Sequence, residues 1–380
     1  MKNMKKVISL LLIFTMVFSL SAVLSSCGTE TYEIALITDK GNIDDKSFNQ
    51  GAWEGVLAFT DANEISHKYY KPEEASDAGY LASIDLAIQG GAKVVVTPGF
   101  LFEVPVYEAQ QKYPDVKFVL LDGAPHTADW ATFETKANTA SVFYQEEQSG
   151  YLAGYAIVKD GYTNLGFMGG MAVPAVQAFG YGYLQGAEAA AQEMDIDVNV
   201  SYHYTGNFDD NDTNKATAKT MYQSGVEVIF ACGGSVGKSV MSAADEVGAK
   251  VIGVDVDQRY DSETIITSAT KNLKTSVIAV LDSVYNTDSF ATYGGKSTYF
   301  NAANNGVGLP TEVIGEANGN AFDRFNSFAK ADYDEVFASL AANEIELVRT
   351  FDVEDSSGYA SAEELTSNLN LNKVMVNTIQ

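Results

Sequence analysis

The sequence predicts an α/β protein with two doubly wound parallel-sheet lobes that face each other across a ligand cleft. Short, continuous apolar runs alternate with longer helical patterns along most of the chain. Such runs are typical of parallel strands that helices cover on both faces. About five of these runs precede Gln145 and about five follow it. The length of 380 residues also fits two domains of about 150 residues each.

The apolar pattern assigns most of the expected elements directly. Before the middle of the chain we expect strands at 33–37, 92–96 and 116–121 and helices at 47–59, 103–113 and 145–158. Further along we expect strands at 164–168, 198–204, 226–231, 250–254 and 265–268 and helices at 173–194, 213–224, 238–247 and 273–285. The tail after Gly306 is less regular, with one expected helix at 332–342 that Asp332 would cap.

These elements suggest how the chain divides into domains. We expect the first lobe to hold residues 31–142 and about 268–312, and the second to hold 143–267 and about 313–350. Residues 351–380 would form a C-terminal tail. Two lobes built from discontinuous stretches require a hinge with more than one crossover.

The N-terminus has the pattern of a targeting segment. Lys2, Lys5 and Lys6 precede an apolar stretch at 7–23, and Leu24-Ser25-Ser26-Cys27 resembles a bacterial lipobox. We therefore expect residues 1–26 to be a signal peptide, Cys27 to be acylated and 27–30 to be a tether. The protein would then be lipid-anchored at the extracytoplasmic face of the cell membrane. An ordinary cleaved signal remains an alternative, and the stretch is short for a membrane span of about 30 Å.

Composition excludes several classes of partner. Charged residues make up 19% of the chain and hydrophobic residues 46%, which is typical of a globular protein. The net charge of −26 repels nucleic acid and anionic lipid surfaces. No zinc-binding spacing is present, and Cys232 at the end of an apolar run is expected to be a buried thiol. We expect a monomer without metal or cofactor.

Polar residues that follow the first expected strand are candidates for ligand binding, because ligands bind beyond the carboxyl ends of parallel strands. Asp39 begins a polar turn, and Ser47 is a candidate N-cap for the next helix. Phe48 and Asn49 would lie in its first turn, where a ring face and an amide suit a planar, hydrogen-bonding heterocycle. Phe48 could instead pack on the core, and Asp44 and Asp45 could be solvated loop charges.

Three residues further along the chain are also candidates. Asp255 follows the strand at 250–254, where a carboxylate can accept bonds from two neighbouring sugar hydroxyls. A calcium loop is excluded there, because the required pattern does not continue. Lys271 could donate to the same hydroxyls or pair with Asp255, or it could be solvated. Phe179 precedes two glycines, Gly180 and Gly182, inside an expected helix, which suggests close backbone approach, although Phe179 could belong to the core.

Two motif-like patterns after the strand at 226–231 do not indicate an enzyme. The stretch 233–237 matches G-x-S-x-G, but a hydrolase of that type needs a His downstream of Ser235, and all three histidines precede it. The stretch 237–239 resembles the end of a P-loop, but Cys232 stands where that pattern requires Gly. The turn at Gly233 and Gly234 is better explained as one that exposes backbone N–H groups at the start of a helix, where they could donate hydrogen bonds to a ligand hydroxyl.

The chain resembles the basic membrane protein family of lipoproteins, the purine-nucleoside receptors of ABC importers. Two stretches in order carry this resemblance most specifically: Asp44-Asp45-Lys46-Ser47-Phe48-Asn49 and Val254-Asp255-Val256-Asp257-Gln258. The other matching stretches are 39–41, 52–55, 99–102, 113–118, 147–154, 169–171, 233–234, 267–271 and 306–309. The resemblance covers nearly the whole chain after the targeting segment and implies a type I periplasmic-binding fold.

The resemblance also implies roles for the candidate residues. Phe48 and Phe179 would sandwich the purine of a guanosine, adenosine or inosine ligand. Asn49 and Asp122 would meet polar edges of the base, with Asp39 close by. The ribose would be held by Asp255, by Lys271 and by the backbone of Gly233 and Gly234. ABC permease subunits would be the protein partners.

The chain departs from the family pattern at two places. Gln177-Ala178 stands where a typical member has a basic pair before the second stacking Phe, and Ala231-Cys232 precedes the double glycine. These differences leave the base preference open. The alternative function is a binding protein or sensor for a sugar or another small signal molecule on the same fold.

Overall fold

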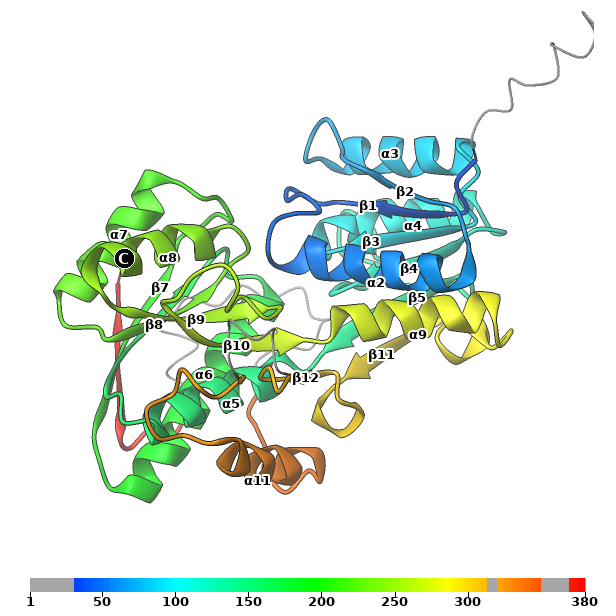
Figure 1. The fold of residues 1–380 in the computed structure, drawn as a ribbon. Coiled ribbons are helices and arrows are strands. Elements are labelled where there is room, and N and C mark those ends of the chain that lie inside the picture. The colour runs from blue at the N-terminus through cyan, green and yellow to red at the C-terminus, as the bar shows by residue number, and fades with distance from the viewer. Residues whose placement is uncertain (1–30, 313–319, 350–368, 380) are drawn as a thin grey trace, which may run out of the picture.

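The computed structural model describes residues 31–312, 320–349 and 369–379, and it consists of two α/β lobes (Figure 1). The expected signal peptide, the tether and Cys27 lie outside the described residues. One lobe contains a six-stranded sheet and the other a seven-stranded sheet. The predicted fold class, two doubly wound parallel-sheet lobes, is therefore confirmed.

The first lobe has the strand order β11-β5-β4-β3-β1-β2, and all neighbouring strands pair in parallel. All four residues of β1 are buried, as expected for a strand that helices cover on both faces. Helices α2 and α9 cover one face of this sheet, and α3 and α4 cover the other. The elements are β1 (Ile34–Ile37), α2 (Phe48–Asn63), β2 (His67–Tyr70), α3 (Asp77–Gln89), β3 (Val94–Pro98), α4 (Glu103–Lys112), β4 (Lys117–Leu121), β5 (Thr139–Tyr144), α9 (Leu273–Tyr285) and β11 (Lys296–Phe300).

The second lobe has the strand order β12-β10-β9-β8-β6-β7-β13, in which only the β10–β12 pair is antiparallel. Helices α5 and α6 cover one face, and α7 and α8 cover the other. The elements are α5 (Glu146–Lys159), β6 (Asn164–Gly169), α6 (Pro174–Met194), β7 (Val198–Tyr204), α7 (Asp212–Gln223), β8 (Val228–Cys232), α8 (Val236–Val247), β9 (Lys250–Asp255), β10 (Ile265–Lys271), β12 (Val307–Gly308), α11 (Lys330–Ala341) and β13 (Val374–Thr378).

Within the described residues the chain passes between the lobes three times. The crossings lie at Gln145, at Asn272 and in the stretch 301–306. The expected division at 142 and 268 differs from the sheets in detail, because β5 completes the first sheet as far as Tyr144 and β10 extends the second as far as Lys271. Strand β12 also pairs within the second sheet, although 268–312 was expected in the first lobe.

The C-terminal stretch contributes to the second lobe at two places. Helix α11 packs against α5 and begins at Lys330, two residues before Asp332. Asp332 is therefore not the N-cap expected from the sequence; its side chain accepts from the backbone N–H of the N-cap residue Ala329 at 2.9 Å. Strand β13 comes from the expected tail and pairs in parallel with β7 at the edge of the sheet. Glu188 on α6 fixes its entry, because its carboxylate accepts backbone N–H bonds from residues 372–374 at 2.8 to 3.2 Å.

Helices α5 and α6 pack with their backbones in contact. A Cβ atom added to Gly182 would lie 1.9 Å from the carbonyl oxygen of Glu147, and one added to Gly154 would lie 2.1 Å from that of Tyr183. Only glycine fits at such distances. Of the two glycines after Phe179, Gly182 therefore allows this close backbone approach, whereas Gly180 faces the Tyr202 side chain. The packing fixes where the first turns of both helices meet the cleft.

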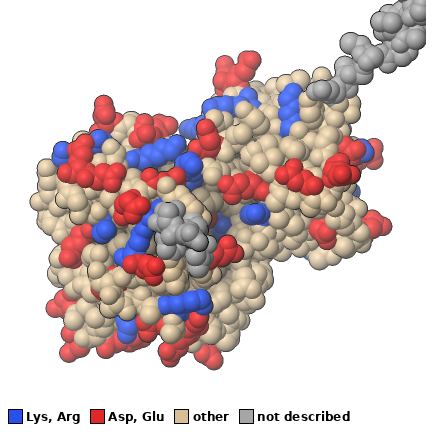
Figure 2. Space-filling model, in the orientation of Figure 1, with Lys and Arg blue, Asp and Glu red and all other residues tan. Residues whose placement is uncertain are grey.

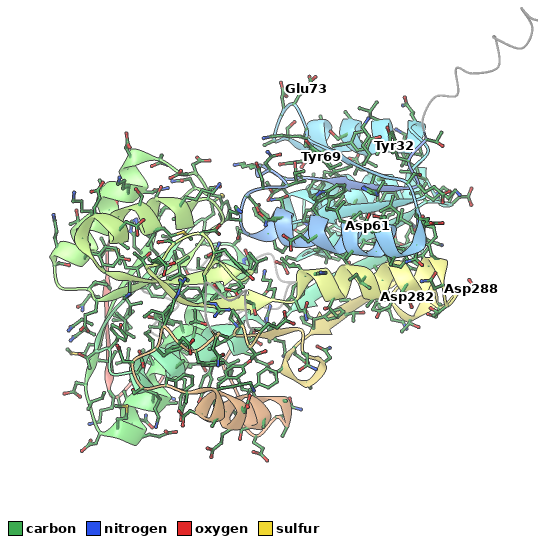
Figure 3. All side chains as sticks on the ribbon, viewed as in Figure 1. Tyr32, Asp61, Tyr69, Glu73, Asp282 and Asp288 are labelled. Carbon is green, nitrogen blue, oxygen red and sulfur yellow. The ribbon has the colours of Figure 1, made fainter. Side chains whose placement is uncertain are left out.

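The surface carries acidic side chains over both lobes (Figure 2). Figure 3 shows Asp61 on α2 and Asp282 and Asp288 on and after α9, in the helical layer of the first lobe. Within 31–312, 320–349 and 369–379, no helix has the length and apolar character needed to cross a bilayer.

Candidate ligand-binding site

A cavity of about 330 Å³ lies where the carboxyl ends of the two sheets face each other. Its volume is within the usual range for small-molecule sites. All the ligand-binding residues named from the sequence line this one cavity: Asp39, Phe48, Asn49, Asp122, Phe179, Gly233, Gly234, Asp255 and Lys271. The first four come from the first lobe and the others from the second.

The two phenylalanines approach the same point from opposite lobes. Phe48 begins α2, and Phe179 lies in α6 with 1% of its surface exposed and its edge against Phe230. The ammonium nitrogen of Lys271 lies 4.8 Å from the ring centroid of Phe48 and 5.3 Å from that of Phe179. The ring centroids are thus no farther apart than the sum of these distances, and both rings line the same cavity.

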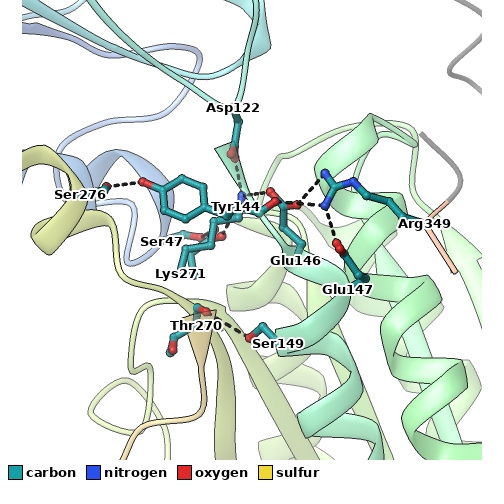
Figure 4. Close-up of polar contacts among 11 residues, drawn as sticks. Ser47, Asp122, Tyr144, Glu146, Glu147, Ser149, Thr270, Lys271, Ser276 and Arg349 are labelled. Atoms are coloured by element: carbon teal, nitrogen blue, oxygen red, sulfur yellow. Dashed lines mark hydrogen bonds and ion pairs between the residues drawn. The ribbon is translucent and has the colours of Figure 1, made fainter. Parts of the chain in front are cut away.

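Lys271 is the centre of an ion-pair network (Figure 4). Its ammonium group binds Asp122, lies 3.4 Å from Glu146 and lies 3.8 Å from Asp255. It is 5% exposed, so these carboxylates replace water around the charge. Burial disfavours the charged ammonium, but the three carboxylates outweigh it and hold the pKa of Lys271 above its usual value. Lys271 is therefore paired and not solvated.

Asp122 and Asp255 place their carboxylates in the cavity through the same unusual backbone conformation. Each residue follows or ends a parallel strand and adopts a left-handed conformation, with φ of 54° and 66°. This conformation is uncommon for residues other than glycine and occurs often at functional sites. It turns the chain sharply at each strand end, so the two side chains approach Lys271 from different lobes.

Asp122 has one oxygen without a hydrogen-bond partner among the described residues. Its Oδ2 binds Lys271, whereas its Oδ1 is buried and unpaired. Burial raises the pKa of Asp122 to about 7, although Lys271 acts in the opposite direction. A buried unpaired oxygen on a cavity wall is free to bond a polar group of a ligand.

Ser47 was expected to cap helix α2 with its hydroxyl, and the structure differs from this expectation. The Ser47 hydroxyl does not cap the helix; it donates to Asp255 across the cleft at 2.5 Å. Asp45 fills the capping role, because its carboxylate accepts backbone N–H bonds from residues 47, 49 and 50 at 2.9 to 3.1 Å. Asp45 is 6% exposed and is therefore not a solvated loop charge.

Asn49 lies on the cavity wall, but its amide is already bonded within the protein. Both amide hydrogens are donated to carboxylates, one to Asp39 and one to Asp45, at 2.8 Å each. Its carbonyl oxygen accepts from the Asp39 backbone at 3.1 Å. Asn49 thus orients Asp39, whose pKa is raised to about 6 by burial despite hydrogen bonds from Gly41 and Asn49.

The turn after β8 brings backbone to the cavity. Gly234 has a φ of 54°, and a Cβ atom at Gly233 would lie 2.7 Å from the backbone nitrogen of Gly170. Cys232 beside them is a buried free thiol whose pKa burial raises. Within the described parts of the chain, no group of His, Cys, Asp and Glu could hold a metal ion.

Several residues on the cavity wall were not singled out from the sequence. Arg349 comes from the segment after α11, and Glu146, at the start of α5, joins the Lys271 network next to the wall. The wall also contains four further aromatic residues: Phe100, Trp130, Phe143 and Phe208. Phe100 belongs to a stretch that carried the family resemblance, but no local pattern marks the other residues as ligand contacts.

Comparison with known proteins assigns the chain that contains this site to a protein family. The model of the Bmp family, described as ABC transporter substrate-binding protein PnrA-like, matches residues 33–343. The chain belongs to this family. As a Bmp protein it is a substrate-binding protein of an ABC transporter and not an enzyme.

Named Bmp relatives match most of the chain. The ABC transporter nucleoside-binding protein BmpA of Lactococcus lactis is 31% identical over 298 residues, which cover 72% of this chain and 80% of that protein. Basic membrane protein A of Borreliella burgdorferi is 29% identical over 297 residues, with coverage of 77% and 83%.

Solved structures share the fold of this Bmp protein. A solute-binding protein of an Aeropyrum pernix ABC transporter has a TM-score of 0.74 at 24% identity, with coverage of 88% and 98%. One from Conexibacter woesei has a TM-score of 0.64 at 22% identity, with coverage of 85% and 100%. At these identities the likeness establishes the type I periplasmic-binding fold alone.

Proposed function

We propose that this Bmp protein captures a purine nucleoside between its lobes and delivers it to an ABC permease. One observation carries the proposal: Phe48 and Phe179 come from different lobes, yet both rings lie within about 5 Å of the same ammonium group in one cavity. Stacking on a base contributes about 1–3 kcal/mol per aromatic ring and tolerates any purine.

The polar groups around these rings suit the rest of a nucleoside. Asp255 and Lys271 would bind the ribose hydroxyls, with the N–H groups near Gly233 and Gly234 as further donors. The unpaired oxygen of Asp122 and the carboxylate of Asp39 would meet the polar edge of the base. Asn49 would act through Asp39 and not by direct contact, because its amide is already bonded.

The relative from Lactococcus lactis carries the name nucleoside-binding protein, which supports the same ligand class for this chain. The lipobox-like sequence before Cys27 supports attachment to the extracytoplasmic face of the membrane through lipid. The permease subunits would then meet the two lobes of a monomeric, tethered receptor.

Ligand identification tests the proposal most directly. The protein is purified without denaturation, and the small molecules it carries are released and identified by mass spectrometry. Calorimetry with guanosine, adenosine, inosine and free ribose then measures affinity. Tight binding of a nucleoside with weak binding of ribose supports the proposal, whereas tight binding of a free sugar alone would favour the sugar-receptor alternative.

A further inference from the structure

We propose that Arg349 is a positioning residue of the ligand site, which binds Glu146 and Glu147 so that Lys271 stays directed at Asp122 and Asp255. The inference rests on the proposed function for its ligand, and it assigns a role to a residue beyond the stretch 33–343 that matches the family model. Arg349 itself lines the cavity, so its guanidinium forms part of the wall as well as part of the network.

The segment that carries Arg349 is fixed to the second lobe. The backbone N–H of Val348 donates to the Gln185 side chain at 2.8 Å, and the Gln185 amide donates back to the Val348 carbonyl at 3.0 Å. Ile345 and Leu347 pack against the core that α5 and α6 share. The segment therefore crosses α6 in a defined position and brings its last described residue to the cleft.

Three hydrogen bonds hold the guanidinium at the first crossing between the lobes. Arg349 Nη1 donates to the backbone carbonyl of Tyr144 at 3.1 Å and also to Glu147, and Nη2 donates to Glu146 at 3.2 Å. Tyr144 ends β5 of the first lobe, whereas both glutamates begin α5 of the second. Arg349 thus joins the two sides of this crossing (Figure 4).

Aromatic rings support the guanidinium plane. Its central carbon lies 6.0 Å from the ring centroid of Tyr299, and Tyr299 stacks on Phe143 with centroids 5.3 Å apart. Phe143 lines the cavity. An arginine can stack in this way while its edge donates hydrogen bonds, which a lysine cannot do.

Charge balance explains why the network needs Arg349. Glu146 and Glu147 are 1% and 3% exposed, and a buried carboxylate without a cation is strongly unfavourable. Glu146 lies between the two cations, with Lys271 at 3.4 Å on one oxygen and Arg349 on the other. Without Arg349, the glutamates would attract the Lys271 ammonium toward α5 and away from Asp122 and Asp255.

The test compares Arg349→Gln with a matched control, Arg324→Gln. Arg324 also donates to two backbone carbonyls, those of Ser262 and Ile265, and pairs with Glu263, but it does not line the cavity. Calorimetry measures inosine, which has a ribose, and hypoxanthine, which does not. We expect Arg349→Gln to weaken inosine binding by about 2- to 30-fold and hypoxanthine binding by less, because Asp255 would act on the ribose alone. Arg324→Gln should change neither affinity.

Two further variants separate the charge effect from a loss of packing. Arg349→Lys keeps the charge but not the planar fork, so it should recover only part of the inosine affinity. Adding Glu147→Gln to Arg349→Gln removes the unpaired charge and should also recover part of it. An unchanged inosine affinity in Arg349→Gln, or equal losses for inosine and hypoxanthine, would overturn the positioning role.

A measurement without ligand keeps the inference testable if the wild-type protein binds no nucleoside. Two charged groups lie next to Glu147: Arg349, from the C-terminal segment, and Glu146, on the same helix. Lys271 and Asp122 lie beyond Glu146. Helix α6 places Gly182 against the Glu147 backbone. Burial raises the pKa of Glu147 and Arg349 lowers it, so loss of Arg349 raises it further.

When a carboxylate has a higher pKa in the folded state than in the unfolded state, the free energy of unfolding falls as pH rises from the unfolded-state pKa toward the folded-state pKa. The destabilisation of Arg349→Gln in urea should therefore be larger near pH 8 than near pH 5, and Glu147→Gln should remove that difference. The same destabilisation at both pH values would contradict the proposed pairing, whatever the ligand.

Discussion

Ser47 on one lobe donates a 2.5 Å hydrogen bond to Asp255 on the other. Two contacts lie beside it: the Gln258 amide donates to the Lys46 carbonyl at 2.6 Å, and the Lys46 ammonium lies 3.5 Å from Asp261. The lobes are thus bonded to each other next to the proposed ribose site. Asp255 belongs both to this contact between the lobes and to the proposed ribose site, because one of its oxygens accepts from Ser47 and the other lies 3.8 Å from the Lys271 ammonium.

The first prediction concerns Asp255. Asp255→Asn keeps the shape of the side chain but removes the charged acceptor, so inosine binding should weaken by about 1.5–3 kcal/mol. Hypoxanthine has no hydroxyls for Asp255 to bind, and its affinity should hardly change. Calorimetry with both ligands checks this. Ser47→Ala serves as the comparison, because it removes the hydrogen bond from Ser47 to Asp255 and leaves the carboxylate. Equal losses for inosine and hypoxanthine in Asp255→Asn would contradict a role at the ribose.

The second prediction concerns the two stacking rings. Phe48→Ala and Phe179→Ala should each weaken guanosine, adenosine and inosine alike by about 1–3 kcal/mol, or roughly 5- to 150-fold, because every purine offers a π-face. Phe290→Ala is a suitable control, since Phe290 belongs to the core of the first lobe and not to the cavity wall. Undiminished binding in both variants would remove the main reason to prefer a nucleoside over a sugar.

The third prediction concerns pH and base preference. The pKa of Asp122 is raised to about 7, mainly by burial, so its carboxyl takes up a proton near neutral pH. A carboxylate accepts from the N1–H and N2–H groups of guanine, whereas a neutral carboxyl can donate to the N1 acceptor of adenine. The ratio of guanosine to adenosine affinity should therefore rise as pH increases through about 7. Calorimetry at several pH values should show this rise in the wild type and a flat ratio in Asp122→Asn.

The same pKa predicts how stability without ligand depends on pH. The folded-state pKa lies above the unfolded value of about 3.9, so the charged form is disfavoured in the folded protein. The contribution of Asp122 to the free energy of unfolding should fall as pH rises from about 4 to about 7. Urea unfolding should show a weaker fall over this range in Asp122→Asn than in the wild type.

The fourth prediction concerns the contact between α5 and α6. In Gly182→Ala the new methyl group would meet the Glu147 carbonyl at 1.9 Å, so the helices must separate. Overpacking of this kind costs about 1–3 kcal/mol of stability. It should also weaken inosine binding, because Phe179 lies one turn earlier on the same helix. Gly237→Ala in α8 is the control, since its Cβ would meet only Met241 Cε, at 3.6 Å. Thermal unfolding and calorimetry on both variants check the prediction.

The fifth prediction concerns the membrane anchor. Cys27→Ala should yield an unprocessed or released protein with unchanged nucleoside affinity, because the proposed ligand contacts all belong to residues 39–271. Fractionation of cells followed by mass measurement of the N-terminus distinguishes these forms. A variant that stays on the membrane at the processed size would show that the anchor lies elsewhere.

The sequence predicts most of the buried strands well and the edge strands poorly, but it misses β5, all six residues of which are buried. Core strands such as β1, β3, β6 and β9 consist of continuous apolar residues, and their expected positions agree with the structure within a few residues. Strand β2 has the sequence His-Lys-Tyr-Tyr, and β11 is exposed over most of its length. These strands lie at sheet edges and need not be apolar on both faces, so no apolar run marks them.

Some residues of the candidate site can also be predicted from the sequence, and others cannot. Residues at or just after the end of a strand, such as Asp255 and Asp39, can be found because the strand ends indicate where a cleft must lie. Arg349 could not be found in this way. It lies in an irregular segment, and its partners Glu146 and Glu147 are about 200 residues away in sequence. The hydroxyl of Ser47 was assigned to its own helix because a local rule was available, whereas its actual partner Asp255 comes from the other lobe.

The order of strands in the second sheet has a consequence for biosynthesis. Its outer strand, β13, comes from residues 374–378, and it pairs with β7, which is synthesised far earlier. A chain made from its N-terminus exposes the open edge of β7 until residues 374–378 leave the ribosome. The second lobe therefore completes its sheet only after residues 374–378 have been synthesised, and a product that ends before them would retain an edge available for pairing with other chains.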